Sequence, residues 1–268
     1  MKSTSNNTSK NNVTILAIGD SGVGKSLIGC AFLGKNDAFI VEDSINRGTS
    51  ETIAQSSTIK GITKHYIDTP AQPIDYFGEF DYDEFLLMNQ YLSKWQYGID
   101  AFFIVLNAQY PRVSPCIKKM MVIMNDFFNN PEIWTHVGII FTRCYPKYYD
   151  PEIGLKCGQQ VYNYIKNLPG CNKIEPQLPT FFVDSKEWQT DKNVQREYQR
   201  MFDFAYENDP IYTHGITFKS KIEYAKLIKD FCNKSIKEYA FWHNNDYYKI
   251  QEELQRSINK IAIKEEEY

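Results

Sequence analysis

One short segment of the chain has the residue types and spacing of a phosphate-binding loop. It reads Gly19-Asp20-Ser21-Gly22-Val23-Gly24-Lys25-Ser26 and fits the pattern G-x-x-x-x-G-K-[ST]. Glycines allow backbone N–H groups to turn toward phosphate oxygens, the lysine ammonium bridges the β and γ oxygens, and the final hydroxyl is a ligand for Mg²⁺. The segment therefore predicts a nucleotide site in which Lys25 binds phosphate and Ser26 binds the metal.

A second polar segment, Asp68-Thr69-Pro70-Ala71-Gln72, follows an apolar run that ends at Ile67. A carboxylate at a strand end, opposite the phosphate loop, is well placed to hold Mg²⁺ through water, so Asp68 is the second predicted metal residue. Ala71 stands where a backbone N–H would approach the γ-phosphate, a position that usually holds glycine. Gln72 is a candidate for orienting the attacking water, and its alternative is a solvent-facing loop glutamine.

The polar stretch 48–53, between these two segments, is long enough to fold over a metal ion when a γ-phosphate is present. One threonine in this part of the chain is expected to ligate Mg²⁺. Thr52 is the first candidate, and the sequence leaves Thr49 and Thr58 open as alternatives.

Apolar patterns predict the elements that must position these residues. Five runs rich in β-branched and aromatic residues predict buried strands at 13–18, 64–67, 101–106, 137–141 and 180–183, with a weaker one at 57–60. Helical spacing predicts helices at 26–33, 85–95, 117–128, 153–164 and 193–207. Ser114 is placed to cap the helix at 117–128, with Pro115 at its first position. Strands that alternate with helices predict a three-layer, doubly wound α/β domain with a mostly parallel sheet.

The 268 residues are enough for one substantial domain and an extension. Residues 1–12 form a Ser, Asn, Lys and Thr tract and are expected to be a disordered lead-in. Residues 13–210 form the predicted nucleotide domain. Residues 211–268 are rich in Lys and Glu, with apolar residues at helical spacing, and predict a helical C-terminal extension.

Composition excludes several classes of partner. The formal net charge is −3 and no long stretch is strongly basic, so no nucleic-acid partner is expected. The six cysteines contain no C-x-x-C pair, which favours reduced thiols in a cytoplasmic protein over disulfides or a zinc site. No apolar run approaches the roughly 18 residues that span a bilayer, so direct membrane insertion is not expected.

Further segments resemble one family when they are read in order. They are Gly98-Ile99-Asp100-Ala101 through Leu106, then Pro111-Arg112-Val113-Ser114, and finally Trp134 through Phe141-Thr142-Arg143. Together with the phosphate loop, over 13–210, they are similar to the AIG-type GTPases, the avirulence-induced and immunity-associated (GIMAP-like) family, relatives of septins and chloroplast import receptors. The resemblance implies a domain that binds GTP or GDP with Mg²⁺ and pairs with a second copy across the nucleotide.

The resemblance also implies a catalytic role for Arg112. In some members an arginine at the matching position reaches the partner's phosphates, and a guanidinium there supplies positive charge where it develops in phosphoryl transfer. The alternative is a surface arginine near a helix start.

Two segments are implied to bind the base. Thr142 and Arg143 begin the base-recognition motif, and Asp184-Ser185-Lys186 resembles the later motif that lines the base pocket. Family members place an acidic residue shortly after that start, because a carboxylate accepts hydrogen bonds from guanine N1 and N2. Here the run continues with Cys144-Tyr145, and Asp150 is the alternative carboxylate if loop 146–149 folds back. Preference for guanine over adenine is therefore left open.

The leading hypothesis is a Mg²⁺-dependent GTPase with slow intrinsic turnover that acts as a nucleotide-controlled switch or dimerising scaffold for an unidentified effector protein. The alternative is a nucleotide-binding interaction module with little hydrolysis or with relaxed purine specificity, because Ala71 and Tyr145 depart from the usual residues. A P-loop kinase is disfavoured, since the sequence shows neither an acceptor pocket nor a basic lid after the core.

Overall fold

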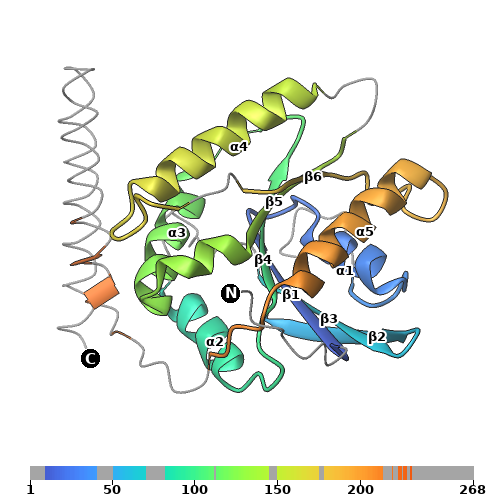
Figure 1. The fold of residues 1–268 in the computed structure, drawn as a ribbon, viewed down its shortest axis with the longest axis horizontal. Helices are drawn as coiled ribbons and strands as arrows, with labels where there is room; N and C mark the ends of the chain where they lie inside the picture. Colours follow the sequence, from blue (N-terminus) through green and yellow to red (C-terminus); the bar gives the residue numbers. More distant parts are fainter. Residues whose placement is uncertain are drawn as a thin grey trace, which may run out of the picture.

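The computed structural model describes residues 10–40, 51–70, 82–111, 113–144, 150–174 and 178–213, together with 219, 223, 224, 226, 227 and 230. In this part of the chain a six-stranded sheet forms the middle layer, with the strand order β2-β3-β1-β4-β5-β6 (Figure 1). The strands are β1 (Asn12–Gly19), β2 (Ile53–Ile59), β3 (Ile62–Asp68), β4 (Ala101–Asn107), β5 (Val137–Thr142) and β6 (Thr180–Phe182).

The sheet is mixed but mostly parallel. The pairs β3·β1, β1·β4, β4·β5 and β5·β6 are parallel, and β2 pairs with β3 in the antiparallel sense. In β4, alternate residues face opposite sides, so Phe102 and Ile104 belong to one apolar cluster and Phe103 and Val105 to the other. This two-sided burial explains why the strand is a continuous apolar run in the sequence.

Helices cover both faces of the sheet, as Figure 1 shows. One face carries α1 (Lys25–Leu33) and α5 (Lys192–Glu207), and the other carries α2 (Tyr82–Ser93), α3 (Pro115–Phe128) and α4 (Pro151–Lys166). A 3₁₀ helix, η1 (Pro131–His136), leads into β5. The predicted three-layer α/β architecture is confirmed.

Polar side chains determine where three of the helices begin. Ser114 Oγ accepts a hydrogen bond from Ile117 N at 3.2 Å and caps α3, with Pro115 at the first helical position as predicted. Asp150 caps α4, and Asp191 caps α5 through N–H groups of its first turn.

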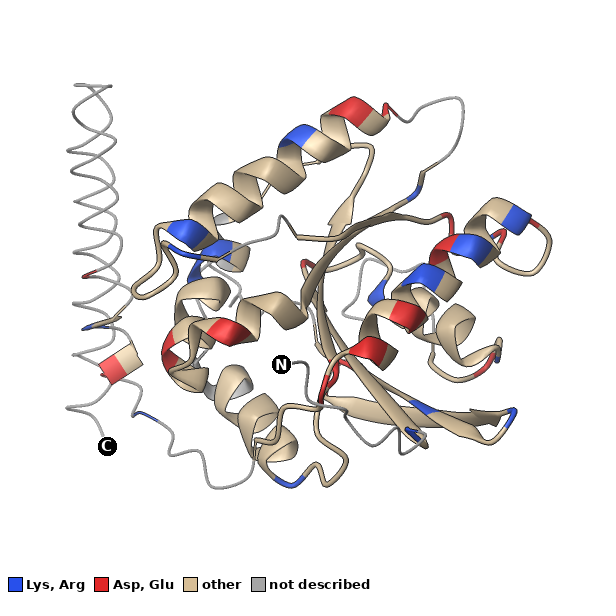
Figure 2. Cartoon of the chain, in the orientation of Figure 1, with Lys and Arg blue, Asp and Glu red and all other residues tan. Residues whose placement is uncertain are grey.

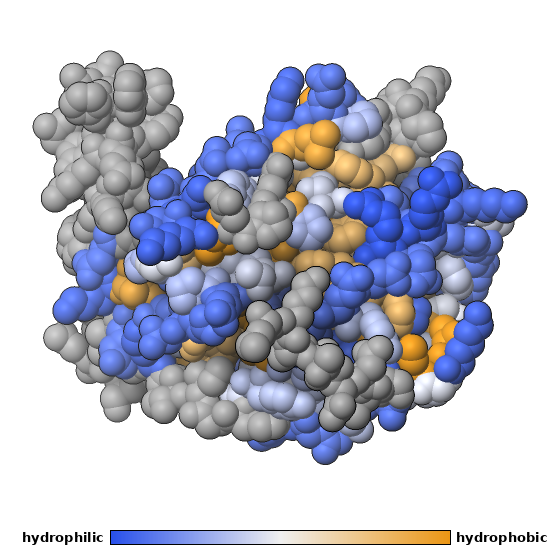
Figure 3. Space-filling view, in the orientation of Figure 1, coloured by the Kyte–Doolittle hydropathy of each residue, from blue (hydrophilic) through white to orange (hydrophobic). Residues whose placement is uncertain are grey.

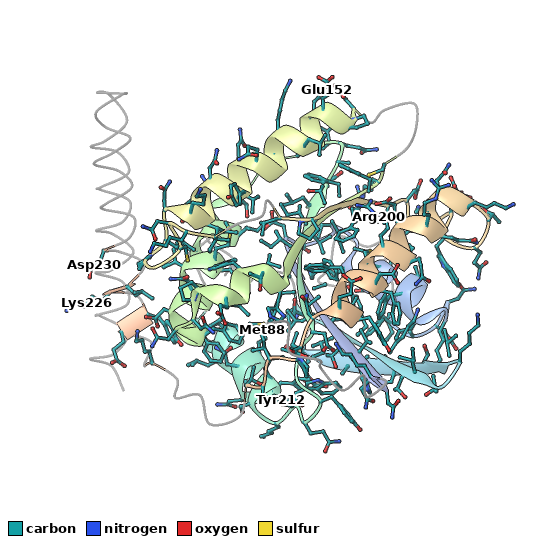
Figure 4. All side chains as sticks on the ribbon, in the orientation of Figure 1. Met88, Glu152, Arg200, Tyr212, Lys226 and Asp230 are labelled. Atoms are coloured by element: carbon teal, nitrogen blue, oxygen red, sulfur yellow. The ribbon has the colours of Figure 1, made fainter. Side chains whose placement is uncertain are left out.

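Helix α5 holds the short strand β6 in place. Phe182 N donates to Glu197 Oε2 at 3.1 Å, and Arg200 pairs with Glu197 at 2.7 Å while its guanidinium lies over the Phe181 ring. Figure 4 labels Arg200 on α5 next to β6, and the colours of Figure 2 mark acidic and basic residues at neighbouring positions along this helix. These contacts compensate for the few ladder hydrogen bonds that three residues can make.

The chain passes from α5 back to the α2 side of the sheet. Ile211 forms an antiparallel bridge with Ile99, and Thr213 Oγ1 donates to Leu92 O at 2.5 Å. Tyr224 is 1% exposed and packs edge-to-face on Phe85, with ring centroids 5.4 Å apart. Most of the predicted C-terminal extension and of the predicted lead-in lies outside the described residues.

At the other end of the described chain, Lys10 is anchored by an ion pair. Its Nζ lies 2.6 Å from Asp100 Oδ1 and donates to backbone carbonyl oxygens at the end of α5. Among the coloured residues of Figure 3, hydrophilic ones are the most frequent, and hydrophobic ones are visible between them. Among the described residues, no helix combines the length and the apolar character needed to cross a bilayer.

Candidate functional site

The segment 19–26 forms a tight loop between β1 and α1, as predicted. Gly22 and Gly24 have φ values of 70° and 99°, in the left-handed region that glycine adopts without strain. Gly24 is also the N-cap of α1 and has no side chain to cap the helix. The N-terminus of α1, the positive end of the helix dipole, therefore lies beside the curve of the loop without a capping side chain.

Gly19 is required for a different reason, which is the close packing of the loop on β4. A Cβ atom at this position would lie 2.5 Å from Val105 O, a backbone atom that cannot move aside. The start of the loop is thus fixed against the centre of the sheet.

Lys25 places its ammonium inside the loop. The residue is 6% exposed, and its Nζ donates to Gly19 O at 2.8 Å and to Asp20 O at 3.1 Å. Tyr66 OH donates to Lys25 O at 2.6 Å and ties the start of α1 to β3. The buried cation lies where phosphate oxygens are expected to enter the loop.

Ser26 and Asp68 meet at the carboxyl end of β3. Ser26 Oγ donates to Asp68 Oδ2 at 2.6 Å, and the Asp68 residue is fully buried. Hydroxyl and carboxylate oxygens are hard ligands of the kind that Mg²⁺ prefers. Within the described ranges no three His, Cys, Asp or Glu side chains form a metal cluster, so a cation here would draw its other ligands from phosphate and water.

The strand register separates the threonine candidates. Thr52 directly precedes β2, whose first residue Ile53 pairs with Asp68. Thr58 pairs with Thr63 near the opposite end of that ladder, and its Oγ1 lies 3.1 Å from Thr63 Oγ1. Of these two threonines, Thr52 is therefore the one beside Asp68. Thr49 lies outside the described residues.

Asp20 points toward α3 rather than into the loop. Its Oδ1 accepts a hydrogen bond from Ser114 Oγ at 2.9 Å, and the same hydroxyl caps α3. The positive end of the α3 dipole stabilises the negative charge of this carboxylate. The sequence indicated the capping role of Ser114 but gave no sign of its contact with the loop.

The end of β5 is fastened to the loop by Thr142 and Arg143. Thr142 Oγ1 lies 2.7 Å from Val23 O and 3.2 Å from Leu106 O. Arg143 has φ of 58°, uncommon for a residue other than glycine, and its Nη2 donates to Gly22 O at 2.9 Å. Thr142 and Arg143, which were predicted to begin the base-recognition motif, therefore contact the phosphate loop.

Asp184 and Ser185 follow β6 and are buried. Asp184 Oδ1 accepts from Lys186 N at 3.2 Å, and burial raises the pKa of this carboxyl above its usual value. Ser185 Oγ and Tyr198 OH are 2.8 Å apart, and burial raises the pKa of the tyrosine. Because Ser185 is turned toward α5, it could contact a base only through its backbone.

Several predicted site residues lie outside the described residues: Ala71, Gln72, Arg112 and Tyr145. Asp150, the alternative base-reading carboxylate, is exposed, and its Oδ1 accepts from Glu152 N at 2.9 Å as the cap of α4. The structure gives this residue a capping role.

The sheet order and the phosphate-loop geometry define an α/β P-loop domain. No protein-family model matches the sequence, and no curated protein matches it. Among solved structures, Toc33 from Arabidopsis thaliana in complex with GDP and Mg²⁺ is similar, with a TM-score of 0.60 at 18% identity, covering 76% of this chain and 88% of that one.

Two further structures are similar to the chain. Toc33 with Mg²⁺ and GMPPNP gives a TM-score of 0.58 at 18% identity, covering 76% of this chain and 88% of that one. A third structure gives 0.59 at 18% identity, covering 75% and 85%, and concerns the chloroplast translocon components atToc33 and psToc159, for whose GTPase activity dimerisation is important. The likeness shows that the chain has the fold of a P-loop G domain.

Proposed function

We propose that this chain binds GTP and GDP together with Mg²⁺, hydrolyses GTP slowly, and acts as a nucleotide-controlled switch or dimerising scaffold. The observation that carries the proposal is the meeting of three groups at one edge of the sheet. The Lys25 ammonium lies inside the glycine loop, and the Ser26 hydroxyl is 2.6 Å from the buried Asp68 carboxylate. A cation and oxygen ligands beside the positive end of a helix dipole form a site suited to a metal-bound triphosphate.

Each residue has a defined task in this proposal. Backbone N–H groups of 21–26 and the Lys25 ammonium bind the phosphates. Ser26 and Thr52 would ligate Mg²⁺, with Asp68 acting through water, and the metal would neutralise charge on the β and γ phosphates. Thr142 and Arg143 hold the base side of the site against the loop through Val23 and Gly22. The similarity to Toc33 structures that contain GDP or GMPPNP with Mg²⁺ supports this assignment.

The proposal also includes GTP hydrolysis and the pairing of two copies of the chain. Gln72 would orient the attacking water, and Arg112 would reach the nucleotide of a second copy of the chain. The importance of dimerisation for the GTPase activity of atToc33 and psToc159 supports the pairing. Such an enzyme would turn over faster at concentrations where dimers form.

A second candidate is a nucleotide-binding interaction module with little or no hydrolysis. It is favoured by Ala71, where a switch loop usually has glycine, and by Tyr145, where a base-reading carboxylate is expected. Phosphate release separates the two candidates, because a module would retain GTP tightly without converting it.

Calorimetric titration of the full chain with GTP and with ATP, each with excess Mg²⁺, tests the proposal. Wild type is expected to bind GTP, and Lys25→Ala is expected to abolish binding while circular dichroism stays native. The matched control is Lys156→Ala, because Lys156 is exposed on α4 and makes only a long contact of 3.9 Å with Glu152. Unchanged GTP affinity in Lys25→Ala would exclude the loop as the phosphate site.

Phosphate release measured over a range of protein concentrations tests the pairing. The rate per molecule is expected to rise with concentration in wild type and to stay low in Arg112→Ala. If the wild-type rate does not depend on concentration, catalysis across a dimer is ruled out.

A further inference from the structure

The imidazole of His65 has a hydroxyl group at one ring nitrogen and an amide oxygen at the other. Ser56 Oγ lies 2.6 Å from His65 Nδ1, and Asn12 Oδ1 lies 3.1 Å from His65 Nε2. Ser56 is on β2, directly opposite His65 on β3, and Asn12 begins β1. A serine bonded to a histidine, which is in turn oriented by a third polar group, is the arrangement that activates a serine as a nucleophile.

The two hydrogen bonds define the direction in which a proton can move. The amide oxygen of Asn12 only accepts, so His65 Nε2 carries the ring proton and donates it. Burial lowers the pKa of His65 below its usual value, so the imidazole is neutral near pH 7 and Nδ1 is an acceptor. Ser56 O–H therefore donates to Nδ1. This is the starting state of a general base that takes a proton from a hydroxyl group.

Two aromatic side chains hold the imidazole in this orientation. Tyr97 stacks on His65 with ring centroids 4.4 Å apart and planes at 16°, and Trp95 meets the same ring edge-on at 5.4 Å. Trp95 Nε1 donates to Gly98 O at 3.0 Å, which fixes the indole. Because His65 is 4% exposed and packed in this way, its ring stays aligned with the serine.

Ser56 lies at the edge of the sheet and is partly exposed. Among the described strands β2 is the outermost on this side, as Figure 1 shows. Ala54 N points away from β3, since it donates to Tyr91 OH at 3.0 Å. Residues two apart in an antiparallel strand direct their N–H groups to the same side, so Ser56 N also points out of this edge. Lys35 Nζ donates to Ser56 O at 2.8 Å and brings positive charge to the same place.

An N–H group beside the nucleophile is what an acyl-transfer reaction needs. The carbonyl oxygen of the substrate becomes negative during attack, and the N–H of the nucleophilic residue itself is one of the donors that stabilise it in serine triads. Ser56 N is on the residue that carries the attacking Oγ. Tyr97, which is 38% exposed, adds an aromatic surface next to His65. These surroundings suit a small ester that carries an apolar or aromatic group.

We propose that Ser56, His65 and Asn12 form a second active site, which hydrolyses small carboxylic esters with an apolar or aromatic group. Asn12 is a positioning residue here, and an asparagine has this place in Cys-His-Asn triads. The site is separate from the nucleotide site, because His65 precedes Asp68 by three residues, about 10 Å along β3. The inference goes beyond the proposed nucleotide function and does not depend on it.

The proposed reaction has two stages. Ser56 Oγ attacks the ester carbonyl carbon and forms a C–O bond, while its proton passes to His65 Nδ1. Asn12 Oδ1 stabilises the imidazolium by accepting from Nε2–H. The bond between the carbon and the alcohol oxygen then breaks, and that oxygen takes the proton from Nδ1. In the second stage water attacks the acyl-serine, His65 accepts a proton from the water and returns it to Ser56, and a carboxylic acid leaves.

A fluorophosphonate probe followed by peptide mass spectrometry tests the nucleophile in the full chain. An activated serine displaces fluoride from phosphorus, whereas a hydroxyl group without a base does not. We expect an adduct on Ser56 in wild type and in Thr58→Ala, and none in Ser56→Ala. Thr58 is the matched control, because it lies two positions along the same strand and its hydroxyl faces Thr63 instead of a histidine. An unlabelled Ser56 in wild type overturns the inference, and that result requires no variant to fold.

Hydrolysis of p-nitrophenyl butyrate, measured without nucleotide and corrected for the rate in buffer, tests the reaction. Ser56→Ala should lower the rate about a hundredfold, because a positioned general base contributes about 10²–10⁴-fold. Asn12→Leu should lower it as well, whereas Asn12→Asp should keep most of the rate, since a carboxylate also accepts from Nε2–H. Circular dichroism confirms that each variant is folded.

Two results of this assay would overturn the inference. One is an equal rate in wild type and Ser56→Ala. The other is an equal loss in Asn12→Leu and Asn12→Asp, which would show that Asn12 has only a structural role. Either result leaves the proposed nucleotide function standing, because GTP binding is measured separately on the same protein.

Discussion

The hydrogen bond between Ser114 and Asp20 joins the phosphate loop to α3, and breaking it should lower the stability of the protein measurably. Ser114 Oγ donates to Asp20 Oδ1 at 2.9 Å and accepts from Ile117 N at 3.2 Å. A hydrogen bond to a charged acceptor contributes about 1.5–3 kcal/mol, and the lower end applies because the pair is part-buried. An N-cap contributes about 1 kcal/mol. Ser114→Ala should therefore lower the free energy of unfolding by about 2.5 kcal/mol.

A pair of substitutions isolates the bond from the cap. Ser114→Asp keeps a good capping residue but cannot donate to Asp20, and it adds repulsion of about 1 kcal/mol between two carboxylates. It should lower stability by about 2.5 kcal/mol in total. Combining it with Asp20→Asn restores a bond in the opposite direction, because the asparagine amide donates. The double variant should regain about 1.5 kcal/mol or more relative to Ser114→Asp alone.

Urea denaturation followed by circular dichroism measures these differences, with all four proteins of the cycle in the same low-salt buffer. Ser114→Thr is the control, because it keeps both the donor and the cap and should stay close to wild type. A coupling energy between the two positions of less than about 0.5 kcal/mol would refute the reasoning, since additive effects mean that the side chains do not interact.

Three further predictions follow from burial and packing. Gly19→Ala should lower the free energy of unfolding by about 1–3 kcal/mol, because the added Cβ would lie 2.5 Å from Val105 O. Gly158→Ala is the control and should be neutral or stabilising, because the nearest atom to its added Cβ would be 3.4 Å away. Thermal melts compare the two variants, and equal effects would contradict the packing argument. Burial raises the pKa of the Cys144 thiol to about 12, so iodoacetamide should label it much more slowly at about pH 8 than it labels a free cysteine. Peptide mass spectrometry measures the labelling rate, and rapid labelling of Cys144 would contradict the prediction. Burial lowers the pKa of His65 below 6.5, so the folded state binds this proton less tightly than the unfolded state. As the pH falls from about 7.5 to about 5.5, the free energy of unfolding measured with urea should therefore decrease more in wild type than in His65→Gln. An equal decrease in the two proteins would contradict the prediction.

The phosphate loop was predictable because its geometry is local. Eight consecutive residues carry the glycines, the lysine and the hydroxyl, with an apolar strand before them and a helix after them. The start of α3 was predictable for the same reason, since Ser114 and Pro115 act on the turn that they begin. Strands β4 and β5 were located correctly because strands buried on both faces are continuous apolar runs.

The bounds of strand β2 were predicted less accurately from the apolar pattern. The sequence placed a weak strand at 57–60, and the structure has β2 at Ile53–Ile59. This strand lies at the edge of the sheet and is mostly exposed, so its residues lack the apolar signal of a buried strand. Its register with β3 nevertheless puts Thr52 beside Asp68, which no local pattern could show.

By itself, the sequence determined the glycine-rich loop between β1 and α1, the order of strands and helices along the chain, and the residue types on which the proposed phosphate and metal site depends. Only the tertiary structure decided which distant side chains meet, such as Ser114 with Asp20, 94 positions apart, and Arg143 with Gly22, 121 positions apart. The physical reason is that a turn or a helix cap is fixed by neighbours in the chain. Contacts between strand ends, in contrast, depend on the order in which the strands are placed in the sheet, and that order is set by packing of the whole core.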